Sequence, residues 1–438
     1  MKNRVLYFSK KLISHELITG SFFVFVGAFV SSVLAFLLNV FLARNLVASD
    51  YGTYASLLSI FTLAIIPGQA ILPVIVKFAT SYFSSGQHSL ARSLYFSSLK
   101  LLSVFALLII LFFTVFSSTL LSFLKISDYG LILLLGIAVA VQYLAVVNAA
   151  FLQSLIKFNV IAVGNLLTGF VRLCAGVLLV VLGFNVLGAV TALILSIFSG
   201  ILFTFYPLRS IFAKDHQQKI KIPYREIAKY AVPTAFSVFF LNSFISTDVI
   251  LVKHYFNPTD AGLYGGLSLI GKAVFYFTGV IPSVMFPLLI RRHTKGESFH
   301  RLFYLALLLV ALPSLTISVF YFIFPEFTVS VFLGKKYLFI APYVGLFAIF
   351  ITIFNMLNVF VNFFLSLQKT KVLIFVLIAA ILQIFLIFLF HSSFYQVIGV
   401  SLITSIVFLI SLFIFYLIEF NQFKEIKKLI ISINNPVE

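Results

Sequence analysis

Three charged side chains fall where the sequence is otherwise apolar, and they are the first candidates for binding or transport chemistry. Arg172 lies near the middle of one apolar stretch, and Asp248 and Lys272 lie at similar depths in two consecutive stretches. Charge within the hydrocarbon region of a membrane is costly, so it favours either a functional site or an ion pair. Arg172 has no acidic partner in the sequence, which favours a role for it in a polar cavity.

Asp248 and Lys272 admit two interpretations. Charges inside membranes commonly pair, so the two residues are expected to form a structural ion pair. In the alternative, Asp248 couples transport to a proton or a sodium ion, and Lys272 stays free for an anionic ligand. Apart from such a coupling ion, we expect no cofactor.

Polar side chains recur at helical spacing in other apolar stretches. A helix places residues three, four and seven positions apart on one face, and such faces must look toward protein or a water-filled cavity. Either substrate contacts or hydrogen bonds between helices would explain them. The candidate cavity residues are Asn165 and Thr168 beside Arg172, Asn355, Asn358 and Asn362 in a later stretch, and Gln142.

The composition indicates a protein that crosses the membrane many times. The chain of 438 residues is 62% hydrophobic and 10% charged, with a mean hydropathy of +1.17, whereas soluble domains carry about a quarter charged residues. Apolar stretches of about 20 residues recur, the length that a helix needs to span a bilayer. We therefore predict an all-α polytopic membrane protein with about twelve spans: 18–43, 54–79, 97–123, 130–154, 159–182, 185–207, 228–254, 262–290, 302–324, 340–366, 372–391 and 395–419.

The net charge of +18 predicts an orientation, and we do not attribute it to nucleic-acid binding. Most Lys and Arg residues fall in the N-terminal tail, in the C-terminal tail or in loops on the same side of the predicted spans. Because cytoplasmic loops carry such an excess, both termini are expected in the cytoplasm. Arg44 and Lys253 lie at the opposite, outer side, where we expect their long side chains to snorkel to the interface.

A short motif occurs twice, at an offset close to half the chain. Asp50, Gly52 and Tyr54 correspond to Asp260, Gly262 and Tyr264. Internal repetition predicts two six-helix lobes, 1–215 and 216–438, related by a pseudo-two-fold axis along the membrane normal. The motif itself is interpreted as a turn that begins a helix: Asp caps the helix, Gly permits the turn and Tyr suits the lipid–water interface.

Signatures of catalysis are missing from the sequence. No Gly-rich phosphate loop precedes a basic helix, and no His, Cys and carboxylate cluster has the spacing of a metal site. The single cysteine, Cys174, lies in an apolar stretch and allows no intrachain disulfide. We therefore expect that the protein is not an enzyme and holds no metal.

Both copies of the repeat resemble a known family. Residues 38–68, LNVFLARNLVASDYGTYASLLSIFTLAIIPG, and residues 247–292, which begin TDVILVKHYFNPTDAGLYGG, are similar to the Wzx-type lipid-linked oligosaccharide flippases. These belong to the multidrug/oligosaccharidyl-lipid/polysaccharide exporter superfamily. The resemblance implies two lobes around a central cavity that work by alternating access in the bacterial inner membrane. It also implies an undecaprenyl-pyrophosphate-linked glycan as substrate, moved to the periplasmic leaflet for O-antigen or exopolysaccharide synthesis, with a polymerase and chain-length machinery as partners.

On this resemblance, Arg172 and Lys272 are the candidates to hold the pyrophosphate, and the Asn and Gln side chains would contact sugars. A cell-wall precursor (lipid II) flippase would use the same chemistry and remains an alternative. A cation or drug antiporter of the same superfamily would need several carboxylates within the spans, whereas Asp248 stands alone. A scaffold without transport activity is the third alternative.

Overall fold

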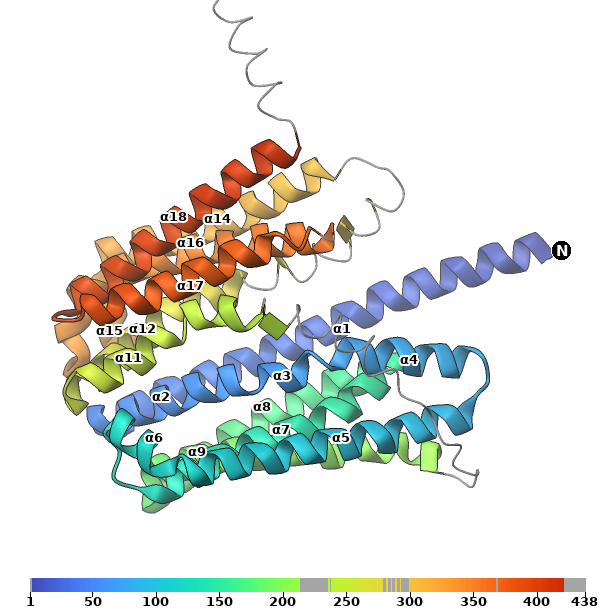
Figure 1. Cartoon of the computed structure of the whole chain (residues 1–438), viewed down its shortest axis with the longest axis horizontal. Coiled ribbons are helices and arrows are strands. Elements are labelled where there is room, and N and C mark those ends of the chain that lie inside the picture. Colours follow the sequence, from blue (N-terminus) through green and yellow to red (C-terminus); the bar gives the residue numbers. More distant parts are fainter. Residues whose placement is uncertain are drawn as a thin grey trace, which may run out of the picture. The chain divides into compact units, whose positions relative to one another are not determined.

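The computed structural model describes residues 2–212, 235–278 except 237, 299–367 and 369–420, with isolated residues between 281 and 292. In these residues the secondary-structure elements are helices, which confirms the predicted all-α class (Figure 1). The α-helices with described bounds are α1 (Lys2–Asn45), α2 (Ala48–Ala64), α3 (Ile66–Gln69), α4 (Leu72–Ser84), α5 (His88–Val115), α6 (Ser117–Leu124), α7 (Tyr129–Ser154), α8 (Phe158–Leu179), α9 (Asn185–Phe205), α11 (Thr247–Tyr255), α12 (Pro258–Thr278), α14 (His300–Ile323), α15 (Pro325–Phe332), α16 (Ala341–Ser366), α17 (Val372–Leu389) and α18 (Phe394–Glu419).

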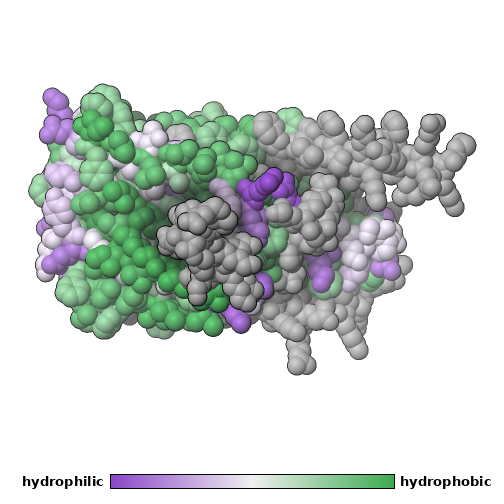
Figure 2. Space-filling model, turned by 90° about the horizontal axis from the view of Figure 1, so that it is seen from above, coloured by the Kyte–Doolittle hydropathy of each residue, from purple (hydrophilic) through white to green (hydrophobic). Residues whose placement is uncertain are grey.

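Nine segments of the described chain are long and apolar enough to cross a membrane. One of them, Phe158–Arg209, holds two predicted spans, because α8 passes into α9 at Gly183, whose φ of 92° breaks the helical path. The predicted spans 228–254 and 262–290 extend into residues outside the described ones, and each remaining prediction has its own segment. Figure 2 shows hydrophobic side chains over much of the coloured surface, as lipid-facing helices require. The chain is a multi-pass membrane protein.

Packing divides the chain into two compact units. The first comprises Met1–Asn242, Val249–Ile270 and Val329–Ile340, and the second comprises Ser243–Asp248, Gly271–Thr328 and Ala341–Glu438. The first unit thus takes in the beginning of the second sequence repeat, including Asp260 and Gly262. The predicted lobe boundary at 215 falls outside the described residues and stays a prediction.

In the first unit, α8 packs between α1 and α9, and α7 packs against α5, α9 and α4. Glycines let α1 and α8 approach closely, as small residues do between membrane helices. A Cβ on Gly27 would lie 2.6 Å from the carbonyl oxygen of Ala162, and a Cβ on Gly169 would lie 2.8 Å from the hydroxyl of Ser31. These contacts fix which face of α8 packs against α1, and α8 is the helix that carries Arg172.

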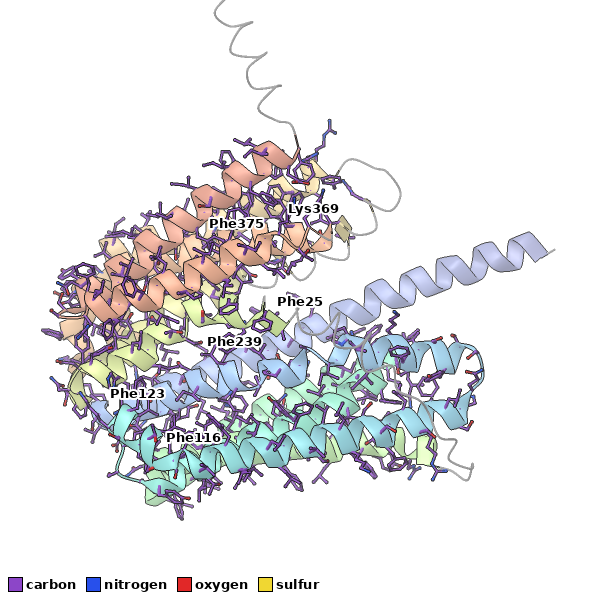
Figure 3. All side chains as sticks on the ribbon, in the orientation of Figure 1. Phe25, Phe116, Phe123, Phe239, Lys369 and Phe375 are labelled. Atoms are coloured by element: carbon purple, nitrogen blue, oxygen red, sulfur yellow. The ribbon has the colours of Figure 1, made fainter. Side chains whose placement is uncertain are left out.

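In the second unit, α16 packs against α14 and α18, and α17 packs against α18. Aromatic rings fill the space between these helices. The ring centroid of Phe303 lies 4.1 Å from that of Phe363 and 5.2 Å from that of Tyr416. At one end of the unit an ion pair joins Lys369 to Glu419 over 2.5 Å, and Figure 3 labels Lys369 there.

The two copies of the Asp-x-Gly-x-Tyr motif meet inside the first unit. A Cβ on Gly52 would lie 2.6 Å from the backbone nitrogen of Gly262, and a Cβ on Gly262 would lie 1.7 Å from the carbonyl oxygen of Ala48. The backbones of α2 and α12 therefore touch, and the glycines serve this crossing instead of a turn. Tyr54 and Tyr264 are only 1% and 0% exposed, so the prediction of tyrosines at the lipid–water interface is wrong.

The two aspartates lie in the first turns of α2 and α12, where negative charge suits the helix dipole, as the sequence predicts. The predicted capping role is wrong in the second copy. Asn257, just before α12, accepts a hydrogen bond at Oδ1 from the backbone nitrogen of Asp260 (2.8 Å) and donates from Nδ2 to Oδ2 of Asp260 (2.7 Å). In the first copy, Val47 precedes α2 and supplies no side-chain cap; Asp50 is already within the helix.

Candidate functional site

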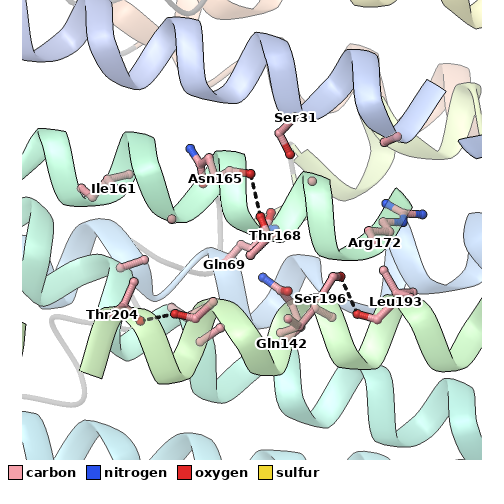
Figure 4. A pocket seen from close by; sticks show the side chains of 18 of the residues that line it. Ser31, Gln69, Gln142, Ile161, Asn165, Thr168, Arg172, Leu193, Ser196 and Thr204 are labelled. Atoms are coloured by element: carbon pink, nitrogen blue, oxygen red, sulfur yellow. Dashed lines mark hydrogen bonds between the residues drawn. The ribbon is translucent and has the colours of Figure 1, made fainter. Parts of the chain in front are cut away.

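A cavity of about 540 Å³ lies within the first unit, in the size range of ligand sites. Its walls come from α1, α2, α7, α8, α9 and the segment around α3 and α4 (Figure 4). Much of the lining is apolar, with polar groups gathered between the helices. The polar lining residues are Ser31, Gln69, Gln142, Asn165, Thr168, Arg172, Ser196 and Thr204.

The sequence predicts part of this arrangement. Asn165, Thr168 and Arg172 follow one another along α8 and all line the cavity, as their spacing indicates (Figure 4). Gln142, another predicted cavity residue, joins them from α7. The structure therefore brings together four of the candidate cavity residues, Gln142, Asn165, Thr168 and Arg172.

Gln69 is a lining residue that the sequence analysis misses. It ends the short helix α3, which follows a break in the helical path at the end of α2. The Pro67-Gly68 pair directly before Gln69 could have indicated its place in the cavity. Proline interrupts helices, and the breaks it makes in membrane-spanning helices line cavities. The carboxamides of Gln69, Gln142 and Asn165 have no hydrogen-bond partner among the described residues, which leaves them available to a ligand.

Arg172 is the charged residue of this cavity. Its Nη2 donates a hydrogen bond to the hydroxyl of Tyr54 over 3.2 Å, and its buried Nε has no partner among the described residues. No carboxylate lines the cavity in the part of the chain that the structure describes. A guanidinium offers five N–H groups in a planar fork that matches a phosphate or a carboxylate. The cavity can therefore bind an anionic group flanked by hydroxyls or amides.

The asparagines of α16 lie in the second unit and do not line this cavity. Asn355 is 2% exposed and donates to the hydroxyl of Thr278 (2.8 Å) and, more weakly, to that of Ser314 (3.4 Å). Asn362 donates to the backbone and side-chain oxygens of Asn358. For Asn355 the geometry supports the interpretation of hydrogen bonding between helices.

Asp248 and Lys272 also belong to the second unit. The Asp248 side chain is fully buried, and its carboxylate interacts electrostatically with the ammonium group of Lys272. This supports the ion-pair interpretation, because a buried charge is stabilised by a nearby opposite charge.

Arg44 is exposed and binds backbone carbonyl groups of the protein, and its predicted place at the outer interface stays a prediction. Its Nε donates to the carbonyl oxygen of Phe332 over 3.0 Å, and its guanidinium also reaches the carbonyl oxygens of Ser330 and Val331. These three carbonyls end α15, where a cation suits the helix dipole. Lys336, which follows α15 in the sequence, donates to the carbonyl oxygens of Arg44 (2.9 Å) and Leu46 (2.6 Å).

Lys253, in contrast, departs from the prediction of snorkelling. Its side chain is buried, and its Nζ donates to the hydroxyl of Thr53 over 3.0 Å, next to the crossing of α2 and α12. The neighbouring His254 stacks on Phe123 with ring centroids 4.1 Å apart. Lys125 donates to the carbonyl oxygen of Phe256 over 3.1 Å. Basic side chains thus hold together the end of the first unit that carries the motif.

A family profile described as "Polysaccharide biosynthesis protein" matches residues 41–342, more than half of the chain. The chain belongs to this family. No curated protein matches the sequence of this family member significantly.

Solved structures of two transporters resemble this polysaccharide biosynthesis protein along most of their length. An inward-facing multidrug resistance transporter of the MATE family is 13% identical, with a TM-score of 0.73, over 90% of this chain and 96% of that one. The lipid II flippase MurJ in an inward closed conformation is 16% identical, with a TM-score of 0.70, over 91% of this chain and 87% of that one.

A third neighbour is a transporter of the same MOP superfamily from Pyrococcus furiosus, for which a binding pocket of reversed polarity is described. It is 14% identical, with a TM-score of 0.57, over 91% of this chain and 95% of that one. At such identities the likeness establishes the fold. This member of the polysaccharide biosynthesis family has the fold of the MOP-superfamily transporters.

The interaction between Asp248 and Lys272 in this family member can be tested directly. Asp248→Asn alone is expected to lower the melting temperature, because it leaves the Lys272 ammonium without its counter-charge. The cost should approach the about 3–5 kcal/mol of breaking a buried pair, because the Asp248 side chain is fully buried. Adding Lys272→Met should recover most of the loss in thermal unfolding of the purified protein. A double variant no more stable than Asp248→Asn would contradict the ion pair and favour ion coupling by Asp248.

Proposed function

We propose that this chain is a flippase that moves a polyprenyl-diphosphate-linked oligosaccharide across the membrane for polysaccharide biosynthesis. The observation that carries the proposal is the cavity of the first unit, in which Arg172 lies among unpartnered carboxamides and no carboxylate lines the wall in the described residues. The family match to polysaccharide biosynthesis and the transporter fold support the same conclusion.

The chemistry of the cavity suits the head group of such a lipid. A diphosphate accepts charge-assisted hydrogen bonds from a guanidinium, and these are strong where water is scarce. The carboxamides of Gln69, Gln142 and Asn165 both donate and accept, as sugar hydroxyls and acetamido groups require. The polyprenyl tail is apolar and can stay in the bilayer. The charge of the cavity disfavours a cation antiporter, which needs lining carboxylates.

The finer parts of the proposal follow from the sequence resemblance. The lipid is undecaprenyl diphosphate, the glycan is an O-antigen or exopolysaccharide unit, and the protein works by alternating access in the bacterial inner membrane with both termini in the cytoplasm. It acts beside a polysaccharide polymerase and chain-length machinery, and it performs no catalysis itself. A proton or sodium ion coupled through Asp248 is the remaining candidate for the energy source.

Deletion of the gene tests the proposal. We expect undecaprenyl-diphosphate-linked oligosaccharide to accumulate and the surface glycan to disappear, as measured by mass spectrometry of extracted lipids and by surface staining. The accumulated species names the cargo, and a muropeptide-bearing lipid would identify a cell-wall precursor flippase instead. Unchanged lipid-linked sugars together with altered drug or cation efflux would contradict the proposal and indicate an antiporter. Re-expression of the intact chain is the control.

A further inference from the structure

Tyr54 contacts Arg172, the charged residue of the cavity, but is not itself a lining residue. The side chain is only 1% exposed, is not among the lining residues, and accepts a hydrogen bond from Nη2 of Arg172 over 3.2 Å. The motif alone predicts this tyrosine at the lipid–water interface. In the structure it meets the candidate binding residue of another helix, 118 positions away.

Packing holds the Tyr54 ring in place. Its centroid lies 6.3 Å from that of Tyr51, whose ring meets Tyr337 edge-on at 6.4 Å. The two residues before Tyr54 are also engaged, since Thr53 accepts the hydrogen bond of Lys253 and Gly52 lies at the crossing with α12. Consecutive residues of a helix point about 100° apart, so one turn of α2 makes three separate contacts. Tyr54 is therefore a rigid hydrogen-bond partner.

A free arginine side chain loses considerable rotamer entropy when a ligand immobilises it, and a group held beforehand loses less. The bond from Nη2 to Tyr54 restrains the guanidinium of Arg172 and uses only one of its N–H groups. Nε has no hydrogen-bond partner among the described residues, and a guanidinium held at Nη2 still has other N–H groups with which to bind an anion. Tyr54 thus meets the requirement for a residue that prepares Arg172 without touching the substrate.

We propose that Tyr54 is a positioning residue that holds the Arg172 guanidinium in the orientation that receives the anionic head group. This inference rests on the proposed function, because the anion is that of the lipid diphosphate. In the first copy of the motif, Tyr54 bonds the cavity arginine. The second copy supplies the crossing partner of α2.

The experiment measures binding of undecaprenyl diphosphate, and of uncharged undecaprenol, to the purified full chain in lipid nanodiscs. Tyr54→Phe removes only the hydroxyl oxygen, and we expect about three- to tenfold weaker binding of the diphosphate, the effect of one lost hydrogen bond. Binding of undecaprenol should not change. In an Arg172→Lys background, which keeps a charge but not the planar fork, the added loss from Tyr54→Phe should shrink to less than about twofold.

Tyr337→Phe is the matched control. This tyrosine is 0% exposed and lies in the same unit, and its hydroxyl has no hydrogen-bond partner among the described residues. The Tyr337→Phe variant should bind both lipids as tightly as the wild type does. If the wild type fails to bind the diphosphate, the proposed function falls and the inference with it. Three results would overturn only the inference, provided that the wild type binds the diphosphate. Tyr54→Phe could bind the diphosphate as tightly as the wild type, or it could weaken binding of both lipids equally. It could also weaken diphosphate binding as much in the Arg172→Lys background as in the wild type.

Discussion

Arg172→Gln is expected to abolish export of the lipid-linked glycan while the protein still accumulates in the membrane. Glutamine keeps hydrogen-bonding capacity but removes the charge that lines the cavity. Losing a charge-assisted contact to the diphosphate costs about 3 kcal/mol, which weakens binding about 100-fold. Staining of the surface glycan and mass spectrometry of the lipid-linked precursor measure export, and immunoblotting of membranes measures protein level.

Two further arginine variants sharpen this test. Arg172→Lys keeps the charge and loses the bidentate fork, so we expect partial export. Arg209→Gln is the matched control, because Arg209 is exposed in the same unit, lies over the ring of Tyr206 and does not line the cavity. It should export normally. Normal export by Arg172→Gln at normal protein level would contradict the proposal that the cavity binds the diphosphate.

Gly262→Ala is expected to cause the largest structural loss of any single methyl group in the described chain. The new Cβ would lie 1.7 Å from the carbonyl oxygen and 2.2 Å from the carbonyl carbon of Ala48. Both are backbone atoms of α2, so no side-chain rotation relieves the clash and the two helices must separate. We expect a cost at or above the upper end of the about 1–3 kcal/mol typical of overpacking, with loss of export. Thermal unfolding of the purified protein measures it.

Glycine variants elsewhere provide the comparison. Gly52→Ala, whose Cβ would lie 2.6 Å from the backbone nitrogen of Gly262, should act in the same direction with a smaller effect. Gly399→Ala in α18 meets no atom within 4 Å, so it should leave export intact and stabilise the helix by up to about 1 kcal/mol. Equal melting temperatures for Gly262→Ala and Gly399→Ala would show that α2 and α12 do not touch in the working protein.

The sequence by itself determined the membrane class, the position of the spans and the polar face of α8. Spans follow from length and hydropathy, because a bilayer leaves a helix no alternative to about 20 apolar residues. The shared face of Asn165, Thr168 and Arg172 follows from the helical period, which depends only on residues within two turns. The lobe boundary near 215 remains a prediction of the repeat alone.

Only the tertiary structure decided which of these faces meet. Gln69 joins the cavity, Tyr54 bonds Arg172 and Lys253 is buried against Thr53 through contacts between residues far apart in the chain. A tyrosine at a helix start has the same local sequence whether it faces lipid or another helix. Its burial depends on how closely two backbones approach and on the rotation of each helix about its axis. Here that approach is set at Gly262, where only the lack of a Cβ lets α2 and α12 touch.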